Sequence, residues 1–146
     1  YAHYRAVKHG AEIHYAQRLA EDTKFPDGYF DIVADCILFH EVTPAAAKKI
    51  VAEVHRILRP GGVFHHTDVG TEGQQGYRAP QSVPEKAGLW VNHRENIEPW
   101  WPMYQNSNFP DVMRSAGFKV VTDHPATTQS PDGRGGFPAL AGIKQA

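Results

Sequence analysis

Apolar residues recur three and four positions apart between residues 43 and 58, which predicts a helix with one apolar face. Thr43 is a suitable N-cap, and Pro44 suits the first helical position. Pro60-Gly61-Gly62 marks where the helix stops. The apolar positions are Ala47, Ile50, Val51, Val54, Ile57 and Leu58.

A strand is predicted on each side of this helix. Residues 30–38 (FDIVADCIL) form an almost continuous apolar run, typical of a parallel strand covered on both faces. Residues 63–69 (VFHHTDV) form the second strand. A strand, a helix and a strand joined this closely predict a right-handed βαβ unit and an α/β fold.

The remaining patterns are shorter. Residues 1–9 have helical composition and end at Gly10, residues 11–17 alternate like a strand, and residues 25–28 (FPDG) read as a turn. Residues 109–116 predict a helix ended by Gly117. Strands are expected at 118–123 and 137–144, joined by the Gly/Pro/Ser-rich turn 129–136.

Residues 70–106 are rich in Gly, Pro, Gln and Asn, yet they contain all three tryptophans. A polar segment that carries so many aromatic side chains is expected to be ordered and packed over something.

Composition narrows the function classes. A chain of 146 residues is enough for one domain, and its formal net charge of −1 gives no electrostatic case for nucleic acid or an anionic membrane as a partner. Cys36 is the single cysteine, and the sequence contains neither a membrane-length apolar run nor a signal peptide. We therefore expect a cytoplasmic protein, and its first residue, Tyr1, indicates that the sequence begins within a longer one.

Two blocks of sequence carry a family resemblance: residues 21–33 (EDTKFPDGYFDIV) and 53–62 (EVHRILRPGG). In this order, with a strand and a helix between, they resemble the pattern of class I S-adenosylmethionine-dependent methyltransferases of the type 11 kind. Residues 115–118 (SAGF) and 141–144 (AGIK) are similar to the entry to the penultimate strand and to the last strand of that family. Residues 39–41 (FHE) with 96–99 (NIEP) resemble one subgroup that acts on small molecules.

The resemblance implies a Rossmann-like methyltransferase sheet of strand order 3-2-1-4-5-7-6, with the last strand antiparallel and helices on both faces. This chain matches strands three to seven. It lacks the glycine-rich GxGxG loop and the acidic residue that closes the second strand, so we expect a partial domain spanning 1–146, truncated at its N-terminus, with the first two strands missing. Residues 70–106 would be a substrate-cover insertion. The strand at 30–38 would then expose an edge, which favours self-association and marginal stability.

The resemblance also implies which residues border the cofactor, S-adenosyl-L-methionine. Ala20 and Glu21 match the adenine-contacting loop, and Leu19 stands where the family commonly has an Asp that accepts from the adenine amino group. Asp35 and Cys36 lie at the carboxyl end of a strand, where ligands gather in open α/β sheets. The alternatives are solvated loop charge at Glu21 and a small half-buried side chain at Cys36.

Three residues are candidates for catalysis: His40, Glu41 and Asp68. An imidazole is a suitable general base for deprotonating a methyl acceptor. Alternatively, His40 packs or caps beneath the following helix, and Glu41 favours its positive N-terminus. We expect no metal, because alternation places His65 and His66 on opposite faces of their strand.

A substrate pocket with aromatic walls and a few polar groups suits a small, flat or cationic ligand. In the alternative reading, the tryptophans only plug the top of the sheet. The candidate substrate-binding residues are Phe39, His66, Trp90, His93, Asn96, Glu98 and Trp100.

The function expected from the resemblance is methyl transfer from S-adenosylmethionine to an O, N or C nucleophile of a small molecule. The alternative is a methyltransferase-like module that binds a ligand or partner without catalysis. A nicotinamide-dependent enzyme is disfavoured, because its fingerprint is missing.

Overall fold

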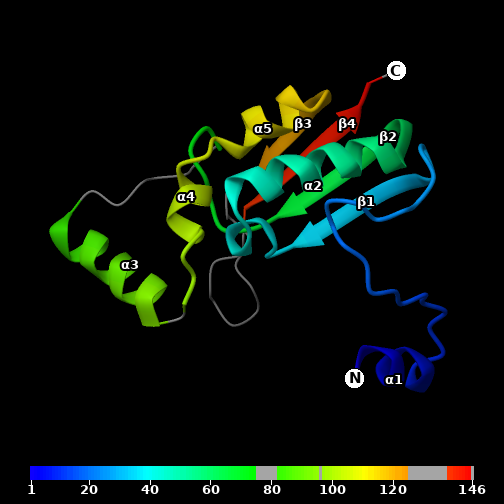
Figure 1. The fold of residues 1–146 in the computed structure, drawn as a ribbon, viewed down its shortest axis with the longest axis horizontal. Coiled ribbons are helices and arrows are strands. Elements are labelled where there is room, and N and C mark those ends of the chain that lie inside the picture. Colours follow the sequence, from blue (N-terminus) through cyan, green and yellow to red (C-terminus); the bar gives the residue numbers. More distant parts are fainter. Residues whose placement is uncertain (75–81, 96, 125–137, 146) are drawn as a thin grey trace.

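The computed structural model describes residues 1–74, 82–95, 97–124 and 138–145. Its centre is a four-stranded sheet in the order β1-β2-β4-β3 (Figure 1). The parallel pair is β1 (Phe30–Cys36) and β2 (Leu58–Thr67), and β4 (Ala139–Lys144) runs antiparallel to both β2 and β3 (Phe118–His124). This is the expected family order 4-5-7-6, with its antiparallel last strand.

The crossover between the parallel strands is the predicted helix, α2 (Pro44–Ile57). Its N-cap is confirmed, since Thr43 Oγ1 accepts a hydrogen bond from Ala46 N at 3.1 Å. The following strand begins at Leu58, five residues before the predicted start. Gly62 permits this, because a Cβ at that position would lie 2.8 Å from the backbone oxygen of Arg59.

Segment 11–17 does not form the predicted strand, so the expectation of strands three to seven is wrong at its first member. The reason is the strand order. In the family, strands two and one lie between strand three and the strand equivalent to β1, and without them this segment has no hydrogen-bonding partner. The helix before it is confirmed as α1 (Ala2–Lys8), and the turn at 25–28 is confirmed with Gly28 at φ +65°.

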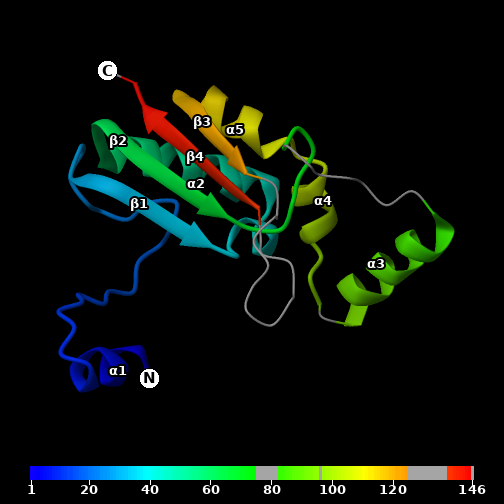
Figure 2. The same cartoon turned by 180° about the vertical axis from the view of Figure 1, so that it is seen from behind.

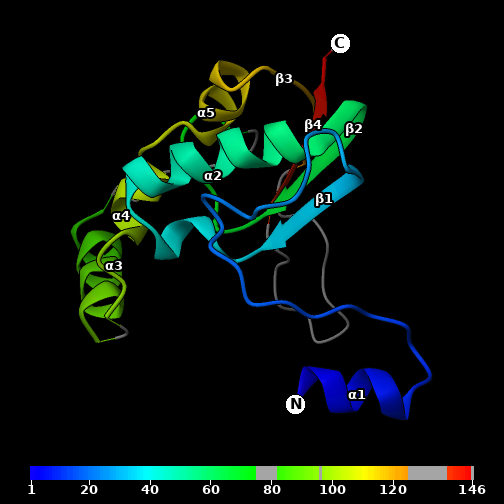
Figure 3. The same ribbon diagram turned by 45° about the vertical axis from the view of Figure 1, so that its right-hand side comes forward.

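Helices cover one face of the sheet in the part of the chain that is described, not both as expected. α2 and α5 (Phe109–Ser115) contact each other on that face, and the opposite face is open when the molecule is turned around (Figures 2 and 3). Ile32 is 65% exposed there, so β1 is not covered on both faces as its apolar run predicted. In a doubly wound sheet, the helices on the second face connect strands that lie on the other side of the first strand. This chain does not match that half of the sheet.

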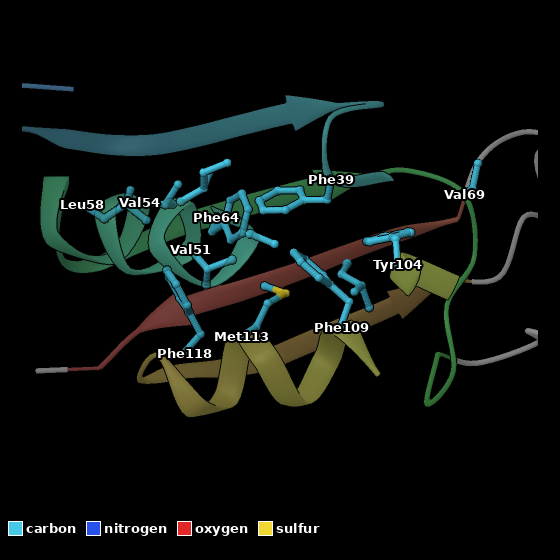
Figure 4. Close-up of a cluster of buried hydrophobic side chains, with 13 residues drawn as sticks. Phe39, Val51, Val54, Leu58, Phe64, Val69, Tyr104, Phe109, Met113 and Phe118 are labelled. Atoms are coloured by element: carbon cyan, nitrogen blue, oxygen red, sulfur yellow. The ribbon is translucent and has the colours of Figure 1, made fainter. Parts of the chain in front are cut away.

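The hydrophobic core lies between the covered face and these helices (Figure 4). Phe64 of β2 and Leu140 of β4 are fully buried there beneath Val51 of α2. The helix before β3 and both last strands are confirmed, with Gly117 at φ +100° between α5 and β3. Phe137 and the predicted turn 129–136 lie outside the described residues.

The segment 70–106 contains two helices where it is described, α3 (Val83–Glu95) and α4 (Trp101–Gln105). α4 packs on η1 (Phe39–Glu41), the short 3-10 turn that follows β1 (Figure 1). Among the described residues, none of the helices is long and apolar enough to cross a membrane.

Candidate active site

The carboxyl ends of β1 and β2 lie side by side, and the loops that follow them carry the candidate catalytic residues. The chain leaves β1 through Ile37, a residue at φ +55°, whose N donates to Thr67 O at 2.8 Å. This sharp turn places His40 of η1 next to Asp68, the first residue after β2, and Glu41 next to His40.

Asp68 lies at the centre of the site's hydrogen bonds and is 1% exposed. Its Oδ2 accepts hydrogen bonds from the backbone N of Leu38 at 3.1 Å and of Phe39 at 2.8 Å. Its Oδ1 accepts from Val69 N at 2.7 Å and from Nδ1 of His40. A carboxylate only accepts hydrogen bonds, so this contact favours the tautomer with a proton on Nδ1 of His40 and orients the imidazole.

His40 is 2% exposed, and its second nitrogen faces away from Asp68. Nε2 lies 3.4 Å from Oε1 of Glu41, whose side chain is 52% exposed. The imidazole also stacks at a tilt on Trp101, with 4.9 Å between ring centroids. His40 does not cap α2, because Thr43 does so; it lies in a row, Asp68–His40–Glu41, that leads from the core to solvent.

A second row, Asp35–His66–Tyr104, lies behind the first. Nδ1 of His66 is 2.9 Å from Oδ2 of Asp35, and its Nε2 is 2.7 Å from the hydroxyl of Tyr104. Burial raises the pKa of Asp35, against the opposing effect of its hydrogen bond to His66. Burial, with the charges of Asp68 and Asp35, raises the pKa of Tyr104 well above its usual range, so the phenol stays protonated and donates to His66.

Two predicted substrate residues are therefore part of the core. His66 is 1% exposed and shares a strand face with Asp68, as alternation predicted, but it pairs with Asp35 instead. Phe39 is 1% exposed and packs edge-on to the His66 ring at 5.2 Å between centroids. The turn of η1 directs Phe39 inward, which its apolar character favours.

The candidate cofactor residues divide into two groups. Ala20 and Asp35 line a common cavity of about 160 Å³. The segment that matches the adenine loop of the family therefore lies next to the end of β1. Glu21 is partly buried beside Ala20, in a turn closed by a bridge between Leu19 and Asp22. Leu19 is 63% exposed, and Cys36 is exposed on the open face of the sheet, away from Asp35.

Glu53, which sequence reasoning did not single out, holds the adenine-loop segment in place. Its Oε1 accepts from both N and Oγ1 of Thr23, at 2.7 and 2.6 Å, and Arg56 donates to the same carboxylate at 2.8 Å. Arg56 also binds Asp27. Glu53 and Arg56, the two fixed residues of the E-x-x-R pattern within 53–62, therefore bind residues of the block at 21–33. These contacts give a physical reason for the two blocks to occur together.

The segment 70–106, the predicted substrate cover, contributes His93 next to Trp101 and Glu98 next to His40. The ring centroids of His93 and Trp101 are 5.3 Å apart, and Glu98 N donates to His93 O at 3.0 Å. Burial lowers the pKa of His93, although the nearby charge of Glu98 opposes the shift. Ligand atoms of His40, Glu41 and Glu98 lie within 4.8 Å of one another.

Trp90 and Trp100, also predicted to line the substrate pocket, are not part of this group. Trp90 is 60% exposed on α3 with the guanidinium of Arg94 over its ring, and Trp100 is partly buried just before α4. Asn96 lies outside the described residues. Tyr104 was missed, since nothing in the local sequence pattern distinguishes it from other aromatic residues of the cover.

Comparisons with known proteins agree with this architecture. A family model described as a methyltransferase domain matches residues 1–65. An uncharacterized methyltransferase of the cyanobacterium Synechocystis is 34% identical over 110 residues, which are 75% of this chain and 48% of that protein. The chain thus spans about half the length of this relative.

Solved structures show the same fold. The YcgJ protein of Bacillus subtilis aligns with a TM-score of 0.62 at 18% identity, covering 99% of this chain and 77% of that one. The 1,6-didemethyltoxoflavin-N1-methyltransferase of Burkholderia thailandensis, solved with its substrate and S-adenosylhomocysteine, aligns with a TM-score of 0.60 at 18% identity. The alignment includes 99% of this chain and 56% of that chain. The strand order, the linked motif blocks and these matches show that the chain has the fold of the class I S-adenosylmethionine-dependent methyltransferases and is similar in sequence to a methyltransferase over 75% of its length.

Proposed function

We propose that the protein carrying this chain is a cytoplasmic enzyme that transfers a methyl group from S-adenosylmethionine to an O, N or C nucleophile of a small molecule. The observation that carries this proposal is the buried pair of Asp68 and His40 at the carboxyl ends of β1 and β2. In a sheet of this order, that is the edge where ligands bind.

Two segments of the chain would contact the cofactor. The turn at 19–22 would border its adenine end and the end of β1 its methionine end, and Ala20 and Asp35 line one cavity. At about 160 Å³ this cavity is smaller than the range of about 300–1,000 Å³ typical of ligand sites. The cofactor, when bound, supplies an electrophilic methyl group on sulfonium.

The residues of the chain would prepare the acceptor. Asp68 holds the Nδ1 proton of His40, so Nε2 is the basic atom of the imidazole. A proton taken from the acceptor by Nε2 can leave through Glu41, which is 3.4 Å away and half exposed. The deprotonated nucleophile would then be ready to accept the methyl group that the bound cofactor would supply. Positioning and exclusion of water by Trp101 and the cover complete the site.

The test is methyl transfer from isotopically labelled S-adenosylmethionine to a panel of small hydroxyl, amine and acidic-carbon acceptors. We expect His40→Gln to lower kcat/KM by about 10²–10⁴-fold, the usual contribution of a general base. His65→Gln is the matched control, because His65 is exposed on the opposite face of β2. Equal rates for both variants would rule out the base role.

Leu19 favours one alternative, a module that binds without catalysis. It is 63% exposed where the family commonly has an Asp, so the adenine amino group would lack that acceptor. This alternative predicts ligand binding with no turnover of any acceptor in the panel.

A further inference from the structure

Three residues of the segment 70–106, His93, Glu98 and Trp101, carry buried polar atoms that have no hydrogen-bond partner among the described residues. Oε2 of Glu98, Nδ1 of His93 and Nε1 of Trp101 are all buried and make no hydrogen bond among the described residues. An unpaired buried polar atom costs about 1–3 kcal/mol. Oε2 of Glu98 is an acceptor, so it indicates a ligand that donates a hydrogen bond to it, whereas Nε1 of Trp101 is a donor and needs a different partner.

The cluster formed by His40, Glu41 and Glu98 contains two carboxyl groups. Glu98 and Glu41 both direct carboxylate oxygens toward His40, and these groups lie within 4.8 Å of one another. No lysine or arginine forms an ion pair with either carboxylate within the described part of the chain. Nε2 of His40 adds a third acceptor, because Asp68 already holds the proton on Nδ1.

An aromatic side chain, Trp101, lies against this cluster. Trp101 lies 4.9 Å from the His40 ring and 5.3 Å from the His93 ring, measured between centroids. Aromatic faces attract organic cations, and an ammonium group has up to three N–H donors for three converging acceptors.

We propose that the methyl acceptor carries a protonated amine, which Glu98, Glu41 and Nε2 of His40 bind against the face of Trp101. This inference rests on the proposed function and makes it specific, with nitrogen as the accepting atom. His40 would take one proton from R–NH3⁺ to give R–NH2. The nitrogen lone pair would then form the new C–N bond as the C–S bond breaks, giving R–NH2–CH3⁺ and the neutral thioether, with one proton released to solvent.

Binding of a matched pair of probes, 2-phenylethylamine and 2-phenylethanol, tests this without any cofactor. The two differ in the ammonium group, so calorimetric titration into the protein should show at least tenfold tighter binding of the amine. Glu98→Gln keeps the size of the side chain and should remove that preference. Glu95→Gln, an exposed change at the end of α3, should leave it intact.

Equal binding of the two probes, or an unchanged preference in Glu98→Gln, would overturn the proposal. A titration with Zn²⁺ alone tests whether the cluster binds a metal ion instead of an amine, because carboxylate and imidazole groups are also ligands for Zn²⁺. Micromolar Zn²⁺ binding that is lost in Glu98→Gln, without any amine preference, would identify a metal site instead. Methyl transfer to hydroxyl acceptors only would also overturn the amine proposal and leave the methyltransferase assignment standing.

Discussion

Glu53 and Thr23 are thirty residues apart and are joined by two hydrogen bonds from the main chain and side chain of Thr23 to one carboxylate oxygen. Glu53 is 7% exposed on the inner side of α2, and Thr23 belongs to the segment expected to border adenine. The contact therefore couples the helix that packs on the sheet to the candidate cofactor loop.

This contact gives a prediction for stability. Glu53→Gln weakens a charge-assisted group of bonds to Thr23 and Arg56, and such bonds are worth about 1.5–3 kcal/mol. Denaturant unfolding at pH 7 should show a loss of that order. Glu12→Gln, an exposed change in the segment before the loop, should change the free energy of unfolding by less than about 0.5 kcal/mol.

The same carboxylate gives a prediction for pH. Hydrogen bonds from Arg56 hold the pKa of Glu53 at about 2, below its usual 4.5. Its charged form is bound more tightly in the folded state, so its contribution is present above pH 4.5 and is lost as the pH falls from 4.5 toward 2. The difference in unfolding free energy between the wild type and Glu53→Gln should shrink over that window. A difference that stays constant from pH 6 to pH 2.5 would contradict this assignment.

Asp68→Asn is a conservative change in size and shape, but it should lower the free energy of unfolding strongly. The amide nitrogen would replace one acceptor oxygen in a carboxylate that accepts from Leu38, Phe39, Val69 and His40. We expect a loss of about 2 kcal/mol or more in unfolding free energy. Asp31→Asn, at a side chain that is 74% exposed, is the control and should have little effect. Similar midpoints for both variants would show that Asp68 does not organise the loop.

Gly62→Ala tests the close approach at the start of β2. The new methyl group would lie 2.8 Å from the backbone oxygen of Arg59 and 3.1 Å from that of Asp31. Neither atom can move without disturbing the sheet, so we expect a loss of about 1–3 kcal/mol in denaturant unfolding. Gly88→Ala in α3 meets nothing within 4 Å and should instead stabilise by up to about 1 kcal/mol. Equal shifts would contradict the packing described here.

The open edge and face of β1 predict self-association of the 146-residue chain. β1 ends the sheet, and Ile32 is 65% exposed on the uncovered face. Ile32→Lys should lower the association constant measured by sedimentation at increasing concentration. Val83→Lys, at a residue 80% exposed on α3, should not. A chain that stays monomeric at all concentrations would contradict this prediction.

Local sequence signals predicted the elements that are stabilised by contacts near in the chain. Thr43-Pro44 marked the start of α2, and Gly117 marked the end of α5, because caps and left-handed residues are read from one or two positions. Segment 11–17 was misassigned because strand formation needs a partner, and alternation alone cannot supply one.

The site was predicted less completely, for a similar reason. His40 and Asp68 were found because both follow strands whose carboxyl ends meet. The partners of His66 could not be inferred, since Tyr104 is thirty-eight residues away and no periodicity connects them. Glu53 belongs to the block 53–62 that carries the family resemblance, but its contact with Thr23 depends on how the loop folds back onto α2.

The central claim, that this fold holds S-adenosylmethionine between the turn at 19–22 and the end of β1, is tested most directly by calorimetric titration of S-adenosylhomocysteine. The titrant should be added to the protein that carries these residues, with any upstream coding sequence included. We predict saturable binding that weakens at least tenfold in Ala20→Trp, which fills the cavity shared with Asp35, and that persists in Ala87→Trp on the exposed side of α3. Absence of binding in the wild-type protein, or equal binding in both variants, would contradict the account.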